Sequence, residues 1–209
     1  MKVNQIRKQI ADAVAVEKET GNLAELIRKS AKAQNIELTN ENLNNLFGFL
    51  QNYIEHVPAL LEKLADQAQE RNMYEDIAPV LQTVQQYFLS SNDVIPDRLG
   101  LLGLLDDAYL AHRVMQEIAE MYSREKGIAL LPVDTTPANE LVRELIGEPH
   151  VSMLEAGIQD ELTREDLQQS LITLLQSEND FRLAGPDPVW GTHDLKNVLS
   201  EEAGGWGIS

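Results

Sequence analysis

The sequence predicts an all-α protein, a compact helical bundle of about five to seven helices with an irregular C-terminal tail. Apolar residues recur at intervals of three and four along most of the chain, whereas the apolar–polar alternation of half-buried strands is almost absent. Apolar residues make up 43% of the 209 residues, which is enough for a hydrophobic core. Because only 5% are aromatic, this core should consist mainly of aliphatic side chains.

The first two predicted helices are separated by a glycine. Residues 2–19 carry apolar side chains on one face, and Gly21 is expected to end this helix. Asn22 is a candidate cap for the second helix, because its side chain can accept a hydrogen bond from the free amides of the first turn. The apolar face of that short helix consists of Leu23, Leu26 and Ile27.

A long helical pattern begins at Thr39 or Asn40 and continues to Leu64. Pro58 lies inside it and should kink or divide the helix, because proline has no amide hydrogen to donate. The next helix has a regular apolar stripe made of Ile77, Val80, Leu81, Val84 and Phe88.

The helical pattern resumes at Leu104 and runs to about Lys126, where Gly127 should end it. Thr136 is the expected cap of the helix that follows, and Thr163 with Asp166 forms an approximate capping box further on. The three helices of this part are expected at residues 137–146, 151–158 and 164–176.

The stretch LLPVDTTP, residues 130–137, is the clearest internal boundary, because it combines two prolines and two threonines without periodicity. We therefore expect a helical body over residues 1–126 and a helical extension over 137–178 that packs on it. Residues 179–209, rich in glycine and proline and containing both tryptophans, should form the irregular tail.

The charge of the chain is strongly uneven. The formal net charge is −17, yet residues 1–32 contain seven basic and four acidic side chains, a balance of +3 that leaves −20 for the remainder. Such an acidic body would repel nucleic acid and anionic membranes, so neither is an expected partner. Only the first two helices can offer a mildly basic face.

The absence of cysteine excludes disulfides, thiolate catalysis and zinc sites that use sulfur ligands. The N-terminal residues show no apolar core of a signal peptide, and the longest apolar stretch, 99–105, is far too short to span a membrane. These observations predict a cytoplasmic protein.

The segment DVIPDRLGLLGLLDD, residues 93–107, combines four aspartates with a dense apolar run. Pro96 should hold the residue before it out of the helical region, which predicts an extended turn between two helices. Asp93 can accept bonds from amides of this turn, and Asp97 is a candidate N-cap of the helix that follows. Gly100 and Gly103 should lie three residues apart on this one helix, a spacing that lets a neighbouring backbone approach closely.

The two aspartates at the end of this segment have different predicted environments. Asp106 shares a side of the helix with Arg113 and Glu117 and should therefore lie on a solvated edge. Asp107 falls among apolar side chains, so its carboxylate should be buried and should need donors or a cation.

These residues together resemble the hallmark of the YkvA-like family, a small bacterial helical domain of unknown function. The resemblance covers roughly residues 80–118 and implies no reaction, substrate or catalytic residue. One departure is Gly100, where members of the family often have a second proline. The matching residues are Asp93, Ile95, Pro96, Asp97, Gly103, Asp106 and Asp107.

The aspartates allow two interpretations. In the first, Asp93 and Asp97 cap the turn, and Asp106 and Asp107 reach back to accept bonds from its amides. In the second, all four carboxylates bind a hard cation such as Mg²⁺, Mn²⁺ or Ca²⁺, which prefers oxygen ligands. No other cofactor is expected.

No catalytic motif is present. The sequence contains no H-E-x-x-H, nucleophile elbow, phosphate-binding loop or dinucleotide-binding fingerprint. The four histidines, at positions 56, 112, 150 and 193, have no metal-ligand spacing, and we expect each to be partly exposed at the surface.

The tail contains both tryptophans, Trp190 and Trp206, which either fold back over the body or anchor a partner. We therefore expect a non-enzymatic protein-interaction module whose partner is another protein, with a second copy of the chain left open as a partner. The alternative is a divalent-cation-binding protein or a metal-dependent enzyme that uses the aspartate cluster.

Overall fold

The computed structural model describes residues 2–89, 94–131, 134–178 and 181–183. Within these ranges the chain is helical and contains no strand, which confirms the predicted class. The expected number of helices was too low, because every segment after residue 135 that showed helical spacing forms a complete helix. The α-helices are α1 (Val3–Thr20), α2 (Asn22–Ala33), α3 (Asn40–Glu70), α4 (Tyr74–Leu89), α5 (Leu105–Lys126), α6 (Thr136–Ile146), α7 (His150–Leu162) and α8 (Glu165–Gln176), and the 3-10 helix η1 spans Asp97–Leu102.

Three of the predicted helix ends are confirmed. Gly21 and Gly127 adopt left-handed backbone conformations, with φ of 65° and 69°, and end α1 and α5. Glycine is suited to these positions because it has no Cβ to clash there. Thr39 caps α3 by accepting a hydrogen bond from the Asn42 amide at 3.1 Å.

Three of the predicted caps are wrong. Asn22 is the first residue of α2 rather than its cap, because Gly21 precedes the helix and the Asn22 side chain donates to the Leu99 carbonyl. Thr136 lies inside α6, and its amide donates to the Asp134 carboxylate at 2.9 Å, so the capping group precedes the threonine. At the start of α8, Arg164 rather than Thr163 precedes the helix, and no capping box forms. Asp166 instead accepts bonds from the Arg164 guanidinium and from the next backbone amide.

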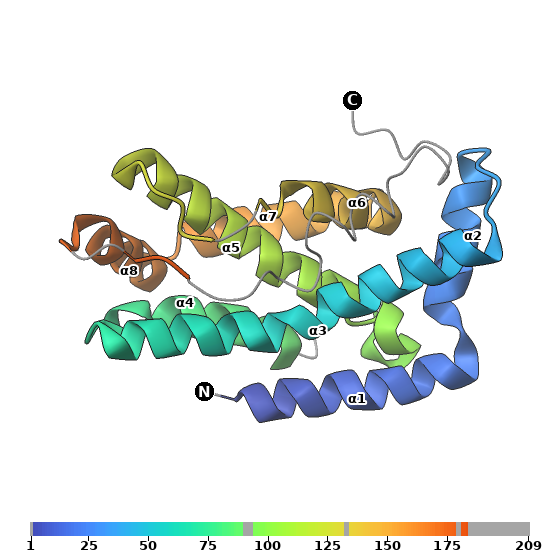
Figure 1. Cartoon of the computed structure of the whole chain (residues 1–209), viewed down its shortest axis with the longest axis horizontal. Helices are drawn as coiled ribbons and strands as arrows, with labels where there is room; N and C mark the ends of the chain where they lie inside the picture. Colours follow the sequence, from blue (N-terminus) through green and yellow to red (C-terminus); the bar gives the residue numbers. More distant parts are fainter. Residues whose placement is uncertain (1, 90–93, 132–133, 179–180, 184–209) are drawn as a thin grey trace.

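Helix α3 is continuous over 31 residues, so of the two predicted effects of Pro58, a kink or a division, the division does not occur. The helix changes direction near its middle, as proline inside a helix commonly causes (Figure 1). Side chains on both sides of the proline, Val57 and Leu60, are buried in the core, and this packing holds the two halves together.

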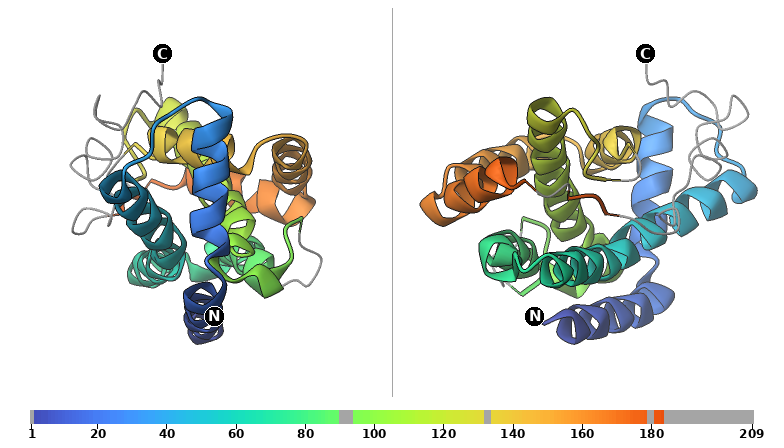
Figure 2. Two further views of the ribbon diagram at one scale, coloured as in Figure 1. Left: turned by 90° about the vertical axis from the view of Figure 1, so that its right-hand side faces the viewer. Right: turned by 60° about the vertical axis from the view of Figure 1, so that its left-hand side comes forward.

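Helix α5 occupies the centre of the bundle (Figures 1 and 2). It packs on α3 and α4 on one side and on α6, α7 and α8 on the other, while α1 packs on α3 and α4. Buried side chains of all eight α-helices belong to one hydrophobic cluster. In the ranges that the structure describes, no helix has the length and hydropathy of a membrane-spanning segment.

The first described residues of the tail lie against the body. Phe181 is fully buried, its amide donates to the Tyr122 hydroxyl at 2.6 Å, and Arg71 lies over its ring. The Leu183 amide donates to the Leu130 carbonyl at 2.8 Å. The chain from 181 to 183 is thus fixed beside the C-terminal end of α5. Trp190 and Trp206, the expected anchors, lie outside the described residues.

Candidate functional site

The DVIPD segment leads into a tight joint between α4 and α5. Pro96 has an extended backbone, with φ −64° and ψ 130°, and the 3-10 helix η1 begins at the next residue. The expectation of one continuous helix through Gly100 and Gly103 is wrong. Gly100 breaks the helical conformation with φ 72° and ψ −137°, and α5 starts only at Leu105.

Gly100 is the point where this joint contacts α1. A Cβ atom at this position would lie 3.1 Å from both the Ala13 carbonyl oxygen and the Glu17 amide nitrogen, and 3.1 Å from a methyl of Val16. The prediction that a glycine here admits a neighbouring backbone is therefore confirmed for Gly100. Positive φ and close approach together make glycine the residue that fits.

The neighbouring turn of α1 is fixed to α2 by a buried carboxylate. Both oxygens of Glu17 accept the Leu23 amide, at 3.0 and 3.1 Å, and Glu17 also accepts the Ala24 amide. The side chain of Asn22 donates to the Leu99 carbonyl at 3.2 Å. Glycine packing and these polar contacts thus join α1, α2 and η1.

Asp106 is buried, with 1% of its surface exposed, so the predicted solvated edge is wrong for this residue. Its Oδ2 accepts a hydrogen bond from the Ile95 amide at 2.8 Å, because the turn before η1 folds back over the first turn of α5. Asp106 therefore accepts a hydrogen bond from an amide of the turn, as the first interpretation of the aspartates predicts. Asp107 is 3% exposed, which confirms its predicted burial.

The cation interpretation stays a prediction. Asp93 and the side chain of Asp97 lie outside what the structure describes, so only Asp106 and Asp107 can be placed. Among the described residues, no group of three or more histidine and carboxylate side chains is arranged to hold a metal ion.

Two histidines expected at the surface form a stacked pair in the core. The rings of His56 and His112 lie 5.4 Å apart, and their side chains come from α3 and α5. His112 Nε2 lies 3.0 Å from the Tyr53 carbonyl, which can only accept, so this nitrogen carries the hydrogen. The prediction of partly exposed histidines is therefore wrong for this pair.

Burial decides the protonation state of both histidines. It lowers the pKa of His56 to about 4, with a contribution from Lys63. Burial and the neighbouring His56 lower the pKa of His112 to about 3, although its hydrogen bond to Tyr53 opposes the shift. Both rings are neutral at pH 7. The signal was present in the sequence, because each histidine continues an apolar stripe: Phe49, Tyr53, His56 and Leu60, and Leu105, Ala108, His112 and Met115.

A chain of buried amides extends from this core to the surface. The Tyr53 hydroxyl donates to Asn139 at 2.6 Å, and Asn139 donates to Gln116, also at 2.6 Å. The Gln116 amide donates in turn to Thr136 and Glu120. Both amide side chains, Asn139 and Gln116, thus have hydrogen-bond partners, and they fix α3, α5 and α6 relative to one another.

An ion-pair network joins α5 to α7 beside these amides. Arg113 lies 2.7 Å from Glu117 and 3.2 Å from Glu155, and Tyr109 also donates to Glu155. Burial alone would raise the pKa of Glu155, but the bonds from Arg113 and Tyr109 lower it below its usual value. A polar pocket of about 400 Å³ opens over these residues and is also lined by Glu120, Glu140 and Arg143.

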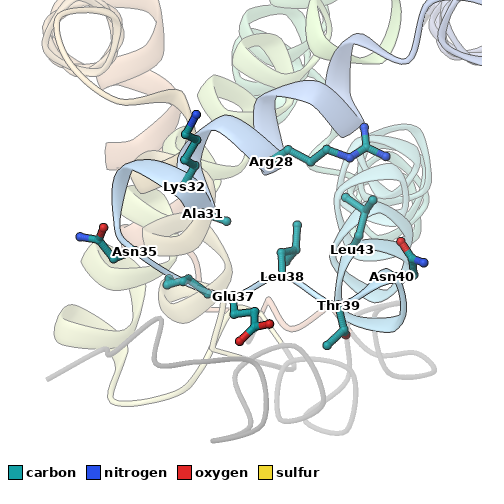
Figure 3. Close-up of a pocket in the computed structure, with 10 residues that line it drawn as sticks. Arg28, Ala31, Lys32, Asn35, Glu37, Leu38, Thr39, Asn40 and Leu43 are labelled. Carbon is teal, nitrogen blue, oxygen red and sulfur yellow. The ribbon is translucent and has the colours of Figure 1, made fainter.

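A second kind of pocket lies on the basic side of the molecule. Between α2 and the start of α3 is a hollow of about 430 Å³, and Leu38 points into it while Arg28 and Lys32 extend from α2 along its edge (Figure 3). An adjoining hollow of about 300 Å³ between α1, α2 and α3 shares Arg28 and Leu43 with the first.

We call these two adjoining hollows the basic groove. They follow one face of α2, because their α2 residues recur at intervals of three and four. The floor is mainly apolar, the rim carries three cations, and two acidic residues, Glu17 and Glu37, also line it. The floor consists of Val14, Ala24, Ala31, Ile36, Leu38, Leu43, Phe47 and Leu101, and the cations are Lys18, Arg28 and Lys32.

The rim cations are available to a ligand. Lys18, Arg28 and Lys32 are exposed, and within the described ranges none of them forms a salt bridge. Leu101 of η1 forms part of the floor, so the joint at Gly100 also shapes the groove. Sequence reasoning had found the basic balance of α1 and α2 but not the hollow.

One comparison with known proteins gives a match. The family DUF1232, described as a protein of unknown function, matches residues 86–112, which include the end of α4, η1 and the first turns of α5. No curated protein and no solved structure matches the chain. The matched segment contains the joint and Leu101, and it leaves α1, α2 and α3 outside.

Proposed function

We propose that this protein is a non-enzymatic interaction module, and that the basic groove binds an acidic, partly apolar helical segment of another protein. The observation that carries the proposal is the combination of an apolar floor with three cations that have no salt-bridge partner among the described residues. These three cations belong to a chain whose formal net charge is −17.

The groove has the dimensions and chemistry of a helix-binding site. Helix α2 has 12 residues and is therefore about 18 Å long, so a partner helix of about three turns would lie along it. Apolar side chains at helical spacing would fill the floor, and carboxylates on the flanks would meet Arg28, Lys32 and Lys18. Because the rest of the surface is acidic, these cations also steer an acidic segment to this face.

The matched segment contributes a structural part of this site. We assign residues 86–112 to the YkvA-like type, because the D-x-I-P-D turn, the glycine and the aspartate pair occur at the spacing described above. In this proposal Gly100 and Asp106 hold η1 in place, and Leu101 contributes to the floor. The absence of cysteine and the acidic composition support a location in the cytoplasm.

The test uses a fluorescein-labelled peptide of about fifteen residues, with leucine at helical spacing and glutamate elsewhere. Fluorescence anisotropy should show that it binds the full chain, and that Arg28→Glu weakens binding at least tenfold. Lys29→Glu is the matched control, because it changes the net charge equally at a neighbouring residue that lines neither hollow. Equal weakening by both variants, or no binding to the unmodified chain, would contradict the proposal.

A further inference from the structure

The C-terminal segment of this chain has the chemistry of a ligand for the basic groove. Residues 184–209 contain four acidic side chains and one lysine, a balance of −3. Within them, Leu195, Val198 and Leu199 occur at intervals of three and four, directly after Asp194 and before a pair of glutamates. This is the pattern of a short amphipathic helix with acidic ends.

The segment is long enough to reach the groove. The described chain ends at Leu183, which is held to Leu130 beyond the C-terminal end of α5. The groove lies near the other end of α5, where η1 contributes Leu101, and the 22 residues of α5 span about 33 Å. The ten residues between Leu183 and Asp194 can extend to roughly 33 Å, so a nearly extended linker covers the length of α5.

Charge favours the basic groove over the polar pocket beside α5 and α7. The pocket beside α5 and α7 is lined by Glu117, Glu120, Glu140 and Glu155, against which an acidic segment is repelled, and one of its two arginines is already paired with Glu117 and Glu155. The groove instead presents Lys18, Arg28 and Lys32 around an apolar floor.

We propose that residues 194–202 occupy the basic groove of the free protein and that a partner segment must displace them. This inference rests on the proposed function, because it takes the groove to be the partner site, and it adds an intramolecular competitor. Leucine and valine side chains of the segment contact the floor, and Glu201 and Glu202 pair with rim cations. Partner binding is thereby restricted to segments that outcompete the tail.

Because the chain has no cysteine, a nitroxide label can be attached at a single site through Ser200→Cys in the full-length protein. Paramagnetic broadening of backbone amide signals should then concentrate on residues 21–43. Adding Arg28→Glu to the labelled chain should reduce this broadening severalfold, whereas adding Lys29→Glu should leave it in place. Broadening that is absent from residues 21–43, or that survives Arg28→Glu undiminished, overturns the inference.

A second readout separates this inference from the proposed function. Glu201→Lys combined with Glu202→Lys should tighten binding of the fluorescent acidic peptide about tenfold, because the competing segment is repelled from the groove. If the peptide binds both chains equally, the proposed function stands and the tail inference falls. If the label broadens residues 21–43 but the peptide binds neither chain, the tail inference stands and the partner proposal falls.

Discussion

The two ends of α5 are held by different means. At its N-terminal end, η1 lies against α1 through Gly100, with no room for a Cβ, and the turn is fixed by one carboxylate, Asp106. Along the rest of α5, contacts to α3, α6 and α7 run through polar side chains such as Tyr53, Asn139 and Arg113. The first region depends on backbone conformation, and the second depends on partnered polar groups.

This difference determines how each region should respond to change. A Cβ at Gly100 would lie 3.1 Å from backbone atoms of α1, which would have to shift by a few tenths of an ångström, so even a methyl group should be costly in the joint. The polar region tolerates changes of shape better but depends on protonation, because its histidines are buried as neutral rings.

The largest effect is expected from Gly100→Ala. An alanine at φ 72° is strained and its Cβ would press on the backbone of α1, so the free energy of unfolding should fall by roughly 3 kcal/mol. The control is Gly48→Ala, at a helical position with open space around it, which should raise stability by about 1 kcal/mol. Urea unfolding of both variants gives the comparison, and a fall of equal size in both would refute the role of the joint.

The next effect concerns pH. An unfolded histidine has a pKa of about 6.5, whereas burial holds His56 near 4 and His112 near 3, so the unfolded chain binds more protons below pH 6.5. The stabilisation is complete above pH 6.5 and is lost as the pH falls. Urea unfolding at pH 7.5 and 5.5 should differ by about 3 kcal/mol, and His112→Gln should roughly halve that difference. An unchanged difference in this variant would show that other groups cause it.

Asp106→Ala should have a smaller effect. It removes the acceptor of the Ile95 amide in the buried turn and should cost about 1–3 kcal/mol in urea unfolding. Asp66→Ala, at an exposed position of α3, should cost less than 0.5 kcal/mol, roughly as surface substitutions do. Similar losses of unfolding free energy in the two variants would indicate that Asp106 lies on a solvated edge of the helix, as the sequence predicted.

The smallest expected effect is that of divalent ions. If the aspartates serve the turn, millimolar Mg²⁺, Mn²⁺ or Ca²⁺ should leave the melting temperature within about 1 °C of that in EDTA, because only a specific ligand raises stability by mass action. A rise of several degrees with one of these ions, absent in Asp106→Ala, would establish the cation site.

The joint was largely predictable from the sequence because its determinants are local. Proline fixes a turn and a glycine permits an approach, and both effects act within a few residues. The burial of Asp106 was missed because the turn that covers it folds back over the helix, and a helical wheel does not represent that turn.

The contacts of the polar region could not be predicted from the sequence in the same way. Tyr53 and Asn139 are 86 residues apart, and Arg113 and Glu155 are 42 apart, so only the fold brings them together. The basic groove is an intermediate case, because Arg28 and Lys32 share a helix face in the sequence, whereas the floor needs side chains from four separate elements.

We propose the basic groove, rather than the polar pocket beside α5, as the site that binds an acidic segment. The most direct measurement is a titration of the isotope-labelled full chain with the acidic leucine peptide, followed by amide chemical shifts. We expect the largest changes on residues 21–43 and on Leu101. Changes concentrated on residues 109–120 and 139–155, or no changes at saturating peptide, would contradict it.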